Sequence, residues 1–268
     1  MKVCMIGNSH LIAIKEGIEE DNCFGADGPI YVFAPGSELT FNIADSHLTP
    51  TAPRARIMLA DGRSASSVDL SLFDAFIVIN SGMSAVQALR VHSVLRSFRR
   101  MTHGTRLVSG AVLTASLCGL LLESKACEIA RQIRAAVAAP IYLVSLPMPP
   151  NKVTTLRLET TSQKRVFDNW KGMFEEELGL ELYQRYVAAA HLAAAEVGAI
   201  FVEQPRETRG PLFTLDQYQA KHKAQFEQRG GEAKAEDLSH MNSAYGRLVA
   251  RDIHRAHYSG AKEEAVST

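Results

Sequence analysis

Short apolar runs separated by turn-forming residues divide the chain. The runs are Val3 to Ile6, Ile30 to Phe33, Phe76 to Ile79, Ile141 to Leu146 and Ile200 to Val202. The first four are followed by turn segments, which are Gly7, Ala34-Pro35-Gly36, Asn80-Ser81-Gly82 and Pro147-Met148-Pro149-Pro150. Short apolar runs that stop in this way are typical of strands buried on both faces of a sheet. We therefore predict five strands, of which the run Val3 to Ile6 suits a strand buried on both faces.

Helical spacing of apolar residues fills most of the intervals between these runs. The spacing predicts helices over residues 11–18, 85–99, 111–137 and 165–197, the last interrupted near Gly179. Residues 37–72 carry no clear period, and we predict that they are irregular or weakly structured. The polar stretch from Gln219 to Glu236 contains Gly230-Gly231 and is the low-order candidate inside the chain.

Alternation of strands and helices over the whole length predicts the fold class. Parallel strands need crossover connections, and these return over one face of the sheet or the other. The expected fold is α/β, a three-layer α/β/α sandwich with a mostly parallel central sheet. Its length suits one domain, which we place at residues 1–258, with a frayed tail at residues 259–268.

Composition narrows the classes of partner and the cellular compartment. The chain has 29 basic and 29 acidic residues and a net charge of zero, so no positive field favours a nucleic acid. Its four cysteines show no CxxC pairing, which predicts reduced thiols and a cytoplasmic protein. No apolar run reaches the ~20 residues that a membrane span needs, and the first is too short for a signal peptide.

The loop after the first strand carries the first candidate for chemistry. In open α/β sheets, ligands bind outside the carboxyl ends of the strands. The segment Gly7-Asn8-Ser9-His10 places Ser9 there, beside the start of a helix, where backbone N–H groups favour developing negative charge. Ser9 is therefore a candidate nucleophile. The alternative is that Asn8 or Ser9 only caps the helix, as both residue types do well.

The segment Asp237-Leu238-Ser239-His240, just before the last apolar-periodic stretch, supplies the partners that a nucleophilic serine needs. Such a serine requires a base, and the base requires an orienting carboxylate. At this spacing Asp237 and His240 can face the same way. The alternative is that Asp237 starts the last helix and His240 is only exposed.

Together the two segments resemble the GDSL/SGNH hydrolase family, which has its first motif after the first strand and a D-x-x-H before the final helix. The resemblance spans nearly the whole chain and implies an SGNH/flavodoxin-like fold, with Ser9 as nucleophile, His240 as general base and Asp237 as its orienting partner. It places an oxyanion glycine at Gly36. This chain departs from the family at Asn8 and His10, and it has Asn80-Ser81-Gly82 in place of G-x-N-D, so the last oxyanion donor is Asn80 or Gly82.

Other candidates are weaker. The turn at Gly7 lacks the further glycines of a dinucleotide-binding G-x-G-x-x-G. No HExxH or comparable metal cluster occurs, so neither metal nor cofactor is expected, and the scattered histidines are expected on surfaces. Trp170 belongs to a helical core stripe with Phe167 and Phe174. The cluster of Arg96, Arg99 and Arg100 is expected on a solvated helix face.

Two functional hypotheses follow. The first is a serine esterase that hydrolyses or transfers an acyl group of a small or carbohydrate ester, for example an O-acetylated glycan, through Ser9, His240 and Asp237. The second is a catalytically weak or inactive protein of the same fold that binds a glycan or a protein, motivated by the altered third motif. The sequence gives no indication of oligomeric state.

Overall fold

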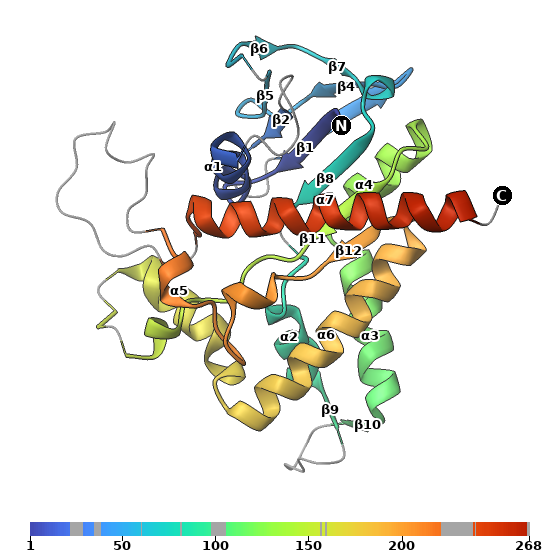
Figure 1. Ribbon diagram of the computed structural model, residues 1–268. Coiled ribbons are helices and arrows are strands. Elements are labelled where there is room, and N and C mark those ends of the chain that lie inside the picture. Colours follow the sequence, from blue (N-terminus) through green and yellow to red (C-terminus); the bar gives the residue numbers. More distant parts are fainter. Residues whose placement is uncertain are drawn as a thin grey trace.

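A seven-stranded sheet with strand order β12-β11-β8-β1-β2-β5-β6 forms the centre of the molecule in the computed structural model (Figure 1). The structure describes the chain except for residues 22–28, 35–38, 60, 81, 98–105, 156, 159, 221–237, 239, 267 and 268. Five strands pair in parallel. They are β1 (Val3–Gly7), β2 (Ile30–Phe33), β8 (Ala75–Ile79), β11 (Ile141–Val144) and β12 (Ile200–Val202).

These five parallel strands are the five predicted from the apolar runs. Every residue of β1, β8 and β11 is buried, which explains why these runs carry no polar alternation. Two further strands, β5 (Arg56–Met58) and β6 (Ser64–Ala65), extend the β2 edge in antiparallel pairing. The parallel strands lie in the order β2-β1-β8-β11-β12, so the chain reverses its winding direction between β1 and β8.

Helices cover both faces of the sheet. Alternate residues of β1 belong to two cores: Val3 and Met5 pack toward α1 (Leu11–Asp21) and α7 (Ser243–Val266), whereas Cys4 and Ile6 pack toward the opposite layer. That layer contains α2 (Val86–Val94), α3 (Gly110–Leu122), α4 (Lys125–Ala136) and α6 (Glu176–Glu196). The predicted fold class, a three-layer α/β/α sandwich with a mostly parallel sheet, is confirmed.

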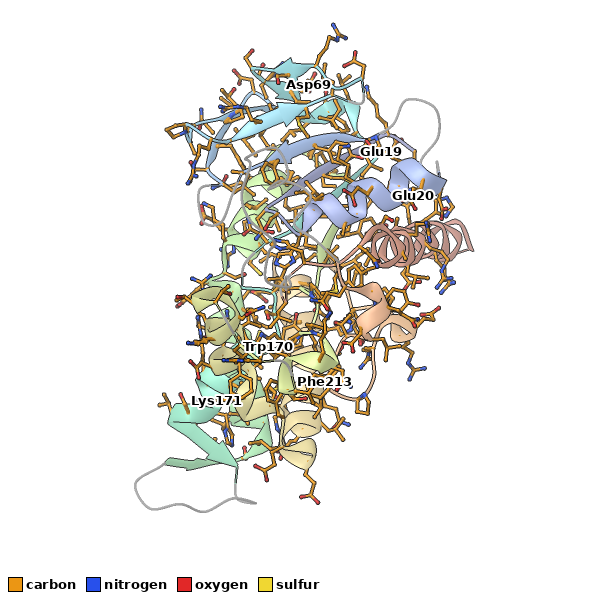
Figure 2. All side chains as sticks on the ribbon, turned by 90° about the vertical axis from the view of Figure 1, so that its left-hand side faces the viewer. Glu19, Glu20, Asp69, Trp170, Lys171 and Phe213 are labelled. Carbon is orange, nitrogen blue, oxygen red and sulfur yellow. The ribbon has the colours of Figure 1, made fainter. Side chains whose placement is uncertain are left out.

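Glycines allow α1 and α7 to cross with their backbones in contact. A Cβ added at Gly246 would lie 1.8 Å from the carbonyl oxygen of Ala13, and one added at Gly17 would lie 2.3 Å from the backbone nitrogen of Arg247. An ion pair flanks the crossing: Arg247 of α7 pairs with Glu20 of α1, which lies beside α7 in Figure 2. The two helices can therefore not shift apart without losing a close-packed crossing.

The helix boundaries correct three predictions. The helix expected over residues 85–99 ends at Val94, and a short strand, β9 (Leu95–Ser97), follows it. The single helix expected over residues 111–137 is two helices, because the Ser124 side chain accepts a hydrogen bond from Cys127 N and caps the start of α4. The helix expected over residues 165–197 is α5 (Thr161–Trp170), a 3-10 turn η3 (Lys171–Met173) and α6. The break lies before α6, whereas Gly179 lies inside α6.

The prediction that residues 37–72 are irregular is wrong. This segment contains β5 and β6 and a separate three-stranded antiparallel sheet of β3 (Phe41–Ala44), β4 (His47–Pro50) and β7 (Val68–Asp69), followed by η1 (Leu70–Leu72). Leu48, Ile57 and Leu70 are fully buried there. The strands are short and bury few residues each, so their apolar positions are too sparse to form a recognisable run.

The remaining elements are short. A parallel pair of β9 (Leu95–Ser97) and β10 (Arg106–Val108) precedes α3, and single turns occur at η2 (Asn151–Thr154), η4 (Arg206–Thr208) and η5 (Asp216–Tyr218). The helix α7 continues into the segment for which the sequence predicts a frayed tail. Among the helices described, none is by itself long and apolar enough to cross a membrane; the bent pair α3 and α4 passes that test by length and composition.

Several single-residue predictions have an outcome here. Trp170 is buried as expected of a core residue and, with Phe213, lies toward the opposite end of the molecule from Asp69 (Figure 2). His92 is also buried, so its predicted surface position is wrong. Cys4, Cys118 and Cys127 are free thiols, as expected. Arg96 lies in the strand β9, so its predicted position on a helix is wrong. Cys23, Arg99 and Arg100 lie outside the described residues, and so does nearly all of the stretch from Gln219 to Glu236.

Candidate active site

The carboxyl ends of β1 and β8 meet at the point where the sheet reverses its winding direction. Gly7 pairs with Ile79 in register, and the next residue, Asn8, donates its backbone N–H to the Ile79 carbonyl over 3.3 Å. Ser9 follows β1 and Asn80 follows β8, so both lie at this reversal. Open α/β sheets bind ligands at such points, because the connections diverge there and leave a crevice.

Ser9 and His240 meet at this edge although 231 residues separate them in the sequence. The distance from the Ser9 Oγ to the His240 Nε2 is 2.8 Å. Both residues are half-buried. In the tautomer that carries its proton on Nδ1, the imidazole accepts the Ser9 hydroxyl proton at Nε2, which is the geometry that general-base activation of a serine needs.

The helices behind the pair explain why it forms. Ser9 lies just before α1, and His240 lies just before α7. These helices cross at Gly17 and Gly246 in direct backbone contact. The contact joins residues 13–17 of α1 to the first residues of α7. The packing of α1 on α7 therefore brings the segment before α7 close to the loop before α1.

Asn8 makes the local hydrogen bonds at the turn before α1, a structural role close to the one that the capping alternative gave to Asn8 or Ser9. Its Oδ1 accepts a hydrogen bond from the His10 backbone N–H at 3.1 Å, and its backbone oxygen accepts one from Leu11 N at 2.9 Å. The Asn8 side chain is 5% exposed. This asparagine holds the turn between β1 and α1, so the Ser9 side chain can face His240 instead of capping the helix.

His10 brings a second imidazole to the pair. The centroids of the His10 and His240 rings lie 5.1 Å apart, with the ring planes 31° from parallel. The sequence identified His10 only as a departure from the family pattern. Nothing in a linear pattern predicts that the residue after the nucleophile contacts the base, because the contact depends on where α7 begins in space.

Two of the predicted site residues lie outside the described residues. They are Asp237, the predicted orienting partner of His240, and Gly36, the predicted oxyanion donor after β2. Their roles stay predictions. Leu238, between Asp237 and His240, is buried at 3% exposure, so this side chain packs against the body of the protein.

Asn80 and Gly82, the two candidate oxyanion donors of the third motif, follow β8 where the sheet reverses its winding direction, and their surroundings differ. Asn80 is 1% exposed and directly follows β8, next to the loop that carries Ser9. Gly82 has a positive φ of 105°, and a Cβ there would lie 2.4 Å from the Cβ of Ser124. A glycine is needed at position 82 for backbone reasons alone. Which of the two donates to an oxyanion stays a prediction.

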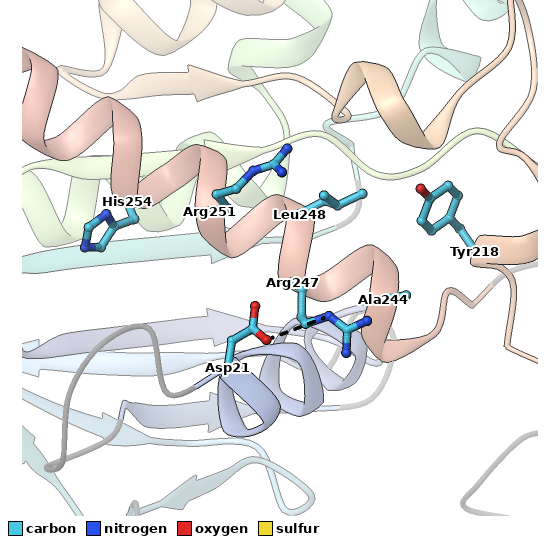
Figure 3. A pocket seen from close by; sticks show the side chains of 7 residues that line it. All are labelled: Asp21, Tyr218, Ala244, Arg247, Leu248, Arg251 and His254. Atoms are coloured by element: carbon cyan, nitrogen blue, oxygen red, sulfur yellow. Dashed lines mark ion pairs between the residues drawn. The ribbon is translucent and has the colours of Figure 1, made fainter.

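No group of three or more His, Cys, Asp or Glu side chains that could hold a metal ion occurs among the residues described. A separate cavity of about 620 Å³ lies along α7 (Figure 3). Its lining includes Asp21, Tyr218, Arg247 and His254 but neither Ser9 nor His240. Asp21 and Arg247 form an ion pair on its lining, with 3.9 Å between the Arg247 Nε and the Asp21 Oδ1 (Figure 3). This cavity is therefore distinct from the candidate active site.

No protein-family model and no curated protein matches this chain. Two solved structures align over most of it. One, a carbohydrate esterase family 2 enzyme with a carbohydrate-binding domain from Myceliophthora fergusii, is 14% identical with a TM-score of 0.38. That alignment covers 97% of this chain and 66% of the esterase chain, so this chain spans just under two thirds of its length.

The other is the periplasmic domain of a lipopolysaccharide acetyltransferase from Salmonella ser. Paratyphi A. It is 9% identical with a TM-score of 0.38, and the alignment covers 95% of this chain and 82% of that domain. Both are similar to this chain in overall outline at low identity. What this chain does therefore has to follow from the chemistry of its own residues.

Proposed function

We propose that the protein is a serine esterase or acyltransferase of the GDSL/SGNH type. One observation carries the proposal: the Ser9 hydroxyl and the His240 imidazole, from opposite ends of the chain, lie within 2.8 Å at the winding reversal of the sheet. A serine that caps a helix or a histidine that only faces solvent has no need of this partner. A nucleophile and its base do need each other.

The proposed reaction uses the pair in two stages. Ser9 Oγ attacks the ester carbonyl carbon while its proton passes to His240 Nε2, and a tetrahedral oxyanion forms. The oxyanion collapses, the bond to the alcohol oxygen breaks, and His240 gives its proton to that alcohol. Water then attacks the acyl-enzyme with His240 again as base, which releases the acid and restores Ser9. A second alcohol in place of water completes an acyl transfer.

The charges that develop in this reaction need partners. Asp237 is proposed to hold the Nδ1–H of His240 and to stabilise the imidazolium. The oxyanion is proposed to bind to the backbone at the start of α1 and to donors at Gly36 and at Asn80 or Gly82. The start of α1 and Gly36 would share the oxyanion with the altered third motif and would compensate for a donor lost there.

The substrate class proposed is the ester of a small or carbohydrate alcohol. The chain has a net charge of zero, which gives no steering toward a strongly anionic partner. The residues described at the pair, Asn8, His10 and Asn80, are polar and carry no fixed charge. Side chains of this kind donate and accept hydrogen bonds with hydroxyl groups, which an O-acetylated sugar presents.

Labelling with a fluorophosphonate probe tests the activation of Ser9. We expect the full-length protein to be labelled at Ser9, as read by peptide mass spectrometry, and labelling to disappear in Ser9→Ala and His240→Ala. Ser145→Ala is the matched control, since Ser145 also follows a parallel strand but contacts no histidine among the described residues. A wild-type protein inert to the probe and to simple acetyl esters would overturn the proposal in favour of a binding protein.

A further inference from the structure

The segment that carries His240 is paired with a neighbouring segment, residues 217–220. The backbone oxygen of His240 accepts a hydrogen bond from Ala220 N at 3.0 Å, and Asn242 N donates to the oxygen of Tyr218 at 2.9 Å. Gln219 and Met241 form an antiparallel bridge between these two bonds. The pairing holds the backbone from His240 to Asn242 against residues 218–220.

Asn242 reinforces this pairing with its side chain and also begins α7. Its Nδ2 donates to the backbone oxygen of Gln217 at 2.7 Å and to that of Gln219 at 3.3 Å. Its Oδ1 accepts from Tyr245 N at 3.1 Å, the bond that an N-cap residue makes to the third residue of a helix. One amide group therefore joins the His240 segment, the 217–220 segment and the first turn of α7.

The 217–220 segment is itself anchored to the sheet. Gln204, just after β12, accepts from Met148 N at 2.9 Å and donates to the hydroxyls of Thr208 and Thr214 at 3.1 and 2.8 Å. Gln204, Thr208 and Thr214 are at most 2% exposed. Leu215 N then bonds to Thr208 O, and Tyr218 N to Leu215 O. Buried and satisfied networks of this kind hold a chain in one arrangement.

We propose that Asn242 is the positioning residue of the proposed active site: its amide fastens the His240 segment to the anchored 217–220 segment and so keeps Nε2 in reach of Ser9. The inference rests on the proposed function for its catalytic meaning. Asn242 touches neither the reacting atoms nor a substrate, and it acts through His240. An asparagine suits the position because it accepts through Oδ1 and donates through Nδ2 at once.

Aspartate separates the two roles of Asn242. Asn242→Asp keeps an oxygen that caps α7, and its charge suits a helix start, but it cannot donate to the oxygens of Gln217 and Gln219. We expect folding and melting temperature to be kept, KM to be unchanged, and kcat on a simple acetyl ester to fall about 10- to 100-fold through misplacement of the base.

Two further variants control for charge. Asn242→Ser keeps a capping oxygen without adding charge, and we expect the same fall in kcat. Asn169→Asp adds the same charge at an exposed position on α5, and we expect it to match the wild type. Wild-type kcat in both Asn242→Asp and Asn242→Ser would overturn the proposal.

A double-variant cycle with His240 tests whether Asn242 acts through the imidazole. In a His240→Ala background, Asn242→Asp should produce no further loss of the residual kcat on a simple acetyl ester, because there is no base left to position. Additive losses in the double variant would instead show that Asn242 supports the fold in general, and would overturn a positioning role.

An exchange measurement separates failure of this inference from failure of the proposed function. Amide hydrogen exchange at Ala220 reports the bond to the His240 oxygen whether or not the protein is an esterase. We expect faster exchange at Ala220 in Asn242→Asp than in the wild type. If Ala220 exchanges faster in Asn242→Asp but the wild type is inert to the probe, the proposed catalytic function is wrong and Asn242 still holds the His240 segment. If exchange at Ala220 is unchanged, Asn242 does not hold the His240 segment and the inference is overturned.

Discussion

Two serines follow parallel strands at the same edge of the sheet, and their surroundings differ. Ser9 follows β1, is half-buried, and lies 2.8 Å from an imidazole nitrogen. Ser145 follows β11, is 2% exposed, and lies 2.9 Å from the hydroxyl of Tyr186, a fully buried residue. Both serines therefore lie at the carboxyl edge of the sheet, and they differ in the side chain that their hydroxyl group contacts.

The partner decides what each hydroxyl can do. Neutral imidazole accepts a proton near neutral pH. A phenol does not, and burial raises the pKa of Tyr186 further above its ordinary value. Ser145 also donates to the backbone oxygen of Leu146 at 3.2 Å, which ties it into the loop. Ser145 is thus a packing residue in a buried network, whereas Ser9 has the partner and the exposure of a nucleophile.

Removal of the His240 imidazole should have the largest effect, because it takes away the partner that distinguishes Ser9 from Ser145. His240→Gln keeps polarity and similar volume but provides no base, so Ser9 becomes as inert as Ser145. We expect kcat/KM on a simple acetyl ester to fall about 10³-fold or more. The melting temperature should stay near that of the wild type, which circular dichroism measures. Retained activity in His240→Gln would show that the hydrolysis occurs elsewhere in the protein.

The helix crossing behind Ser9 gives the next largest effect. In Gly246→Ala the added methyl group would lie 1.8 Å from Ala13 O, in backbone that cannot yield locally. We expect the free energy of unfolding to drop by about 1–3 kcal/mol or more, with a parallel fall in labelling of Ser9. Chemical denaturation measures the first quantity.

A matched glycine on the opposite face of the sheet is the control for this prediction. Gly119 in α3 is exposed and has nothing within 4 Å of an added Cβ. Gly119→Ala should stabilise the protein by about 0.5–1 kcal/mol, because alanine is the better helix former. If both variants changed stability alike, the α1–α7 crossing would not be the close contact described here.

The smallest effect tests the Ser145 side of the comparison. Tyr186→Phe removes the phenol oxygen while Ser145 keeps its bond to Leu146 O. We expect the free energy of unfolding to fall by about 1 kcal/mol, the net value of one buried hydrogen bond, with Ser9 labelling unchanged. Urea denaturation and the probe together check this. Loss of labelling in Tyr186→Phe would mean that the Ser145–Tyr186 contact after β11 is coupled to Ser9 after β1.

Much of the fold was predictable because the signal was strong and local. The strands β1, β8 and β11 are buried at every residue, and β2 and β12 are apolar runs with less buried ends, so each is a continuous apolar run in the sequence. The short strands of residues 41–69 were missed because each buries few residues and is stabilised by its neighbours. The break at Ser124 was missed because serine caps a helix only when the backbone allows it.

The candidate site was likewise predictable from the sequence only in part. A serine after the first strand and a histidine before the last helix could be identified from the sequence, since both positions follow from element boundaries. Asn242 was also within reach, because an asparagine directly before an apolar-periodic stretch is a helix-start signal. Its bonds to Gln217 and Gln219 were not, since they depend on how a distant segment packs.

By itself the sequence determined which residues could be strands, which could be helices, and which side chains were capable of chemistry. Only the tertiary structure decided that Ser9 faces His240 while Ser145 faces Tyr186. The physical reason is that periodicity and turn signals arise within one element. The pairing of side chains 231 residues apart arises from helix crossings and strand order, such as the contact of Gly17 and Gly246 with the opposing backbone.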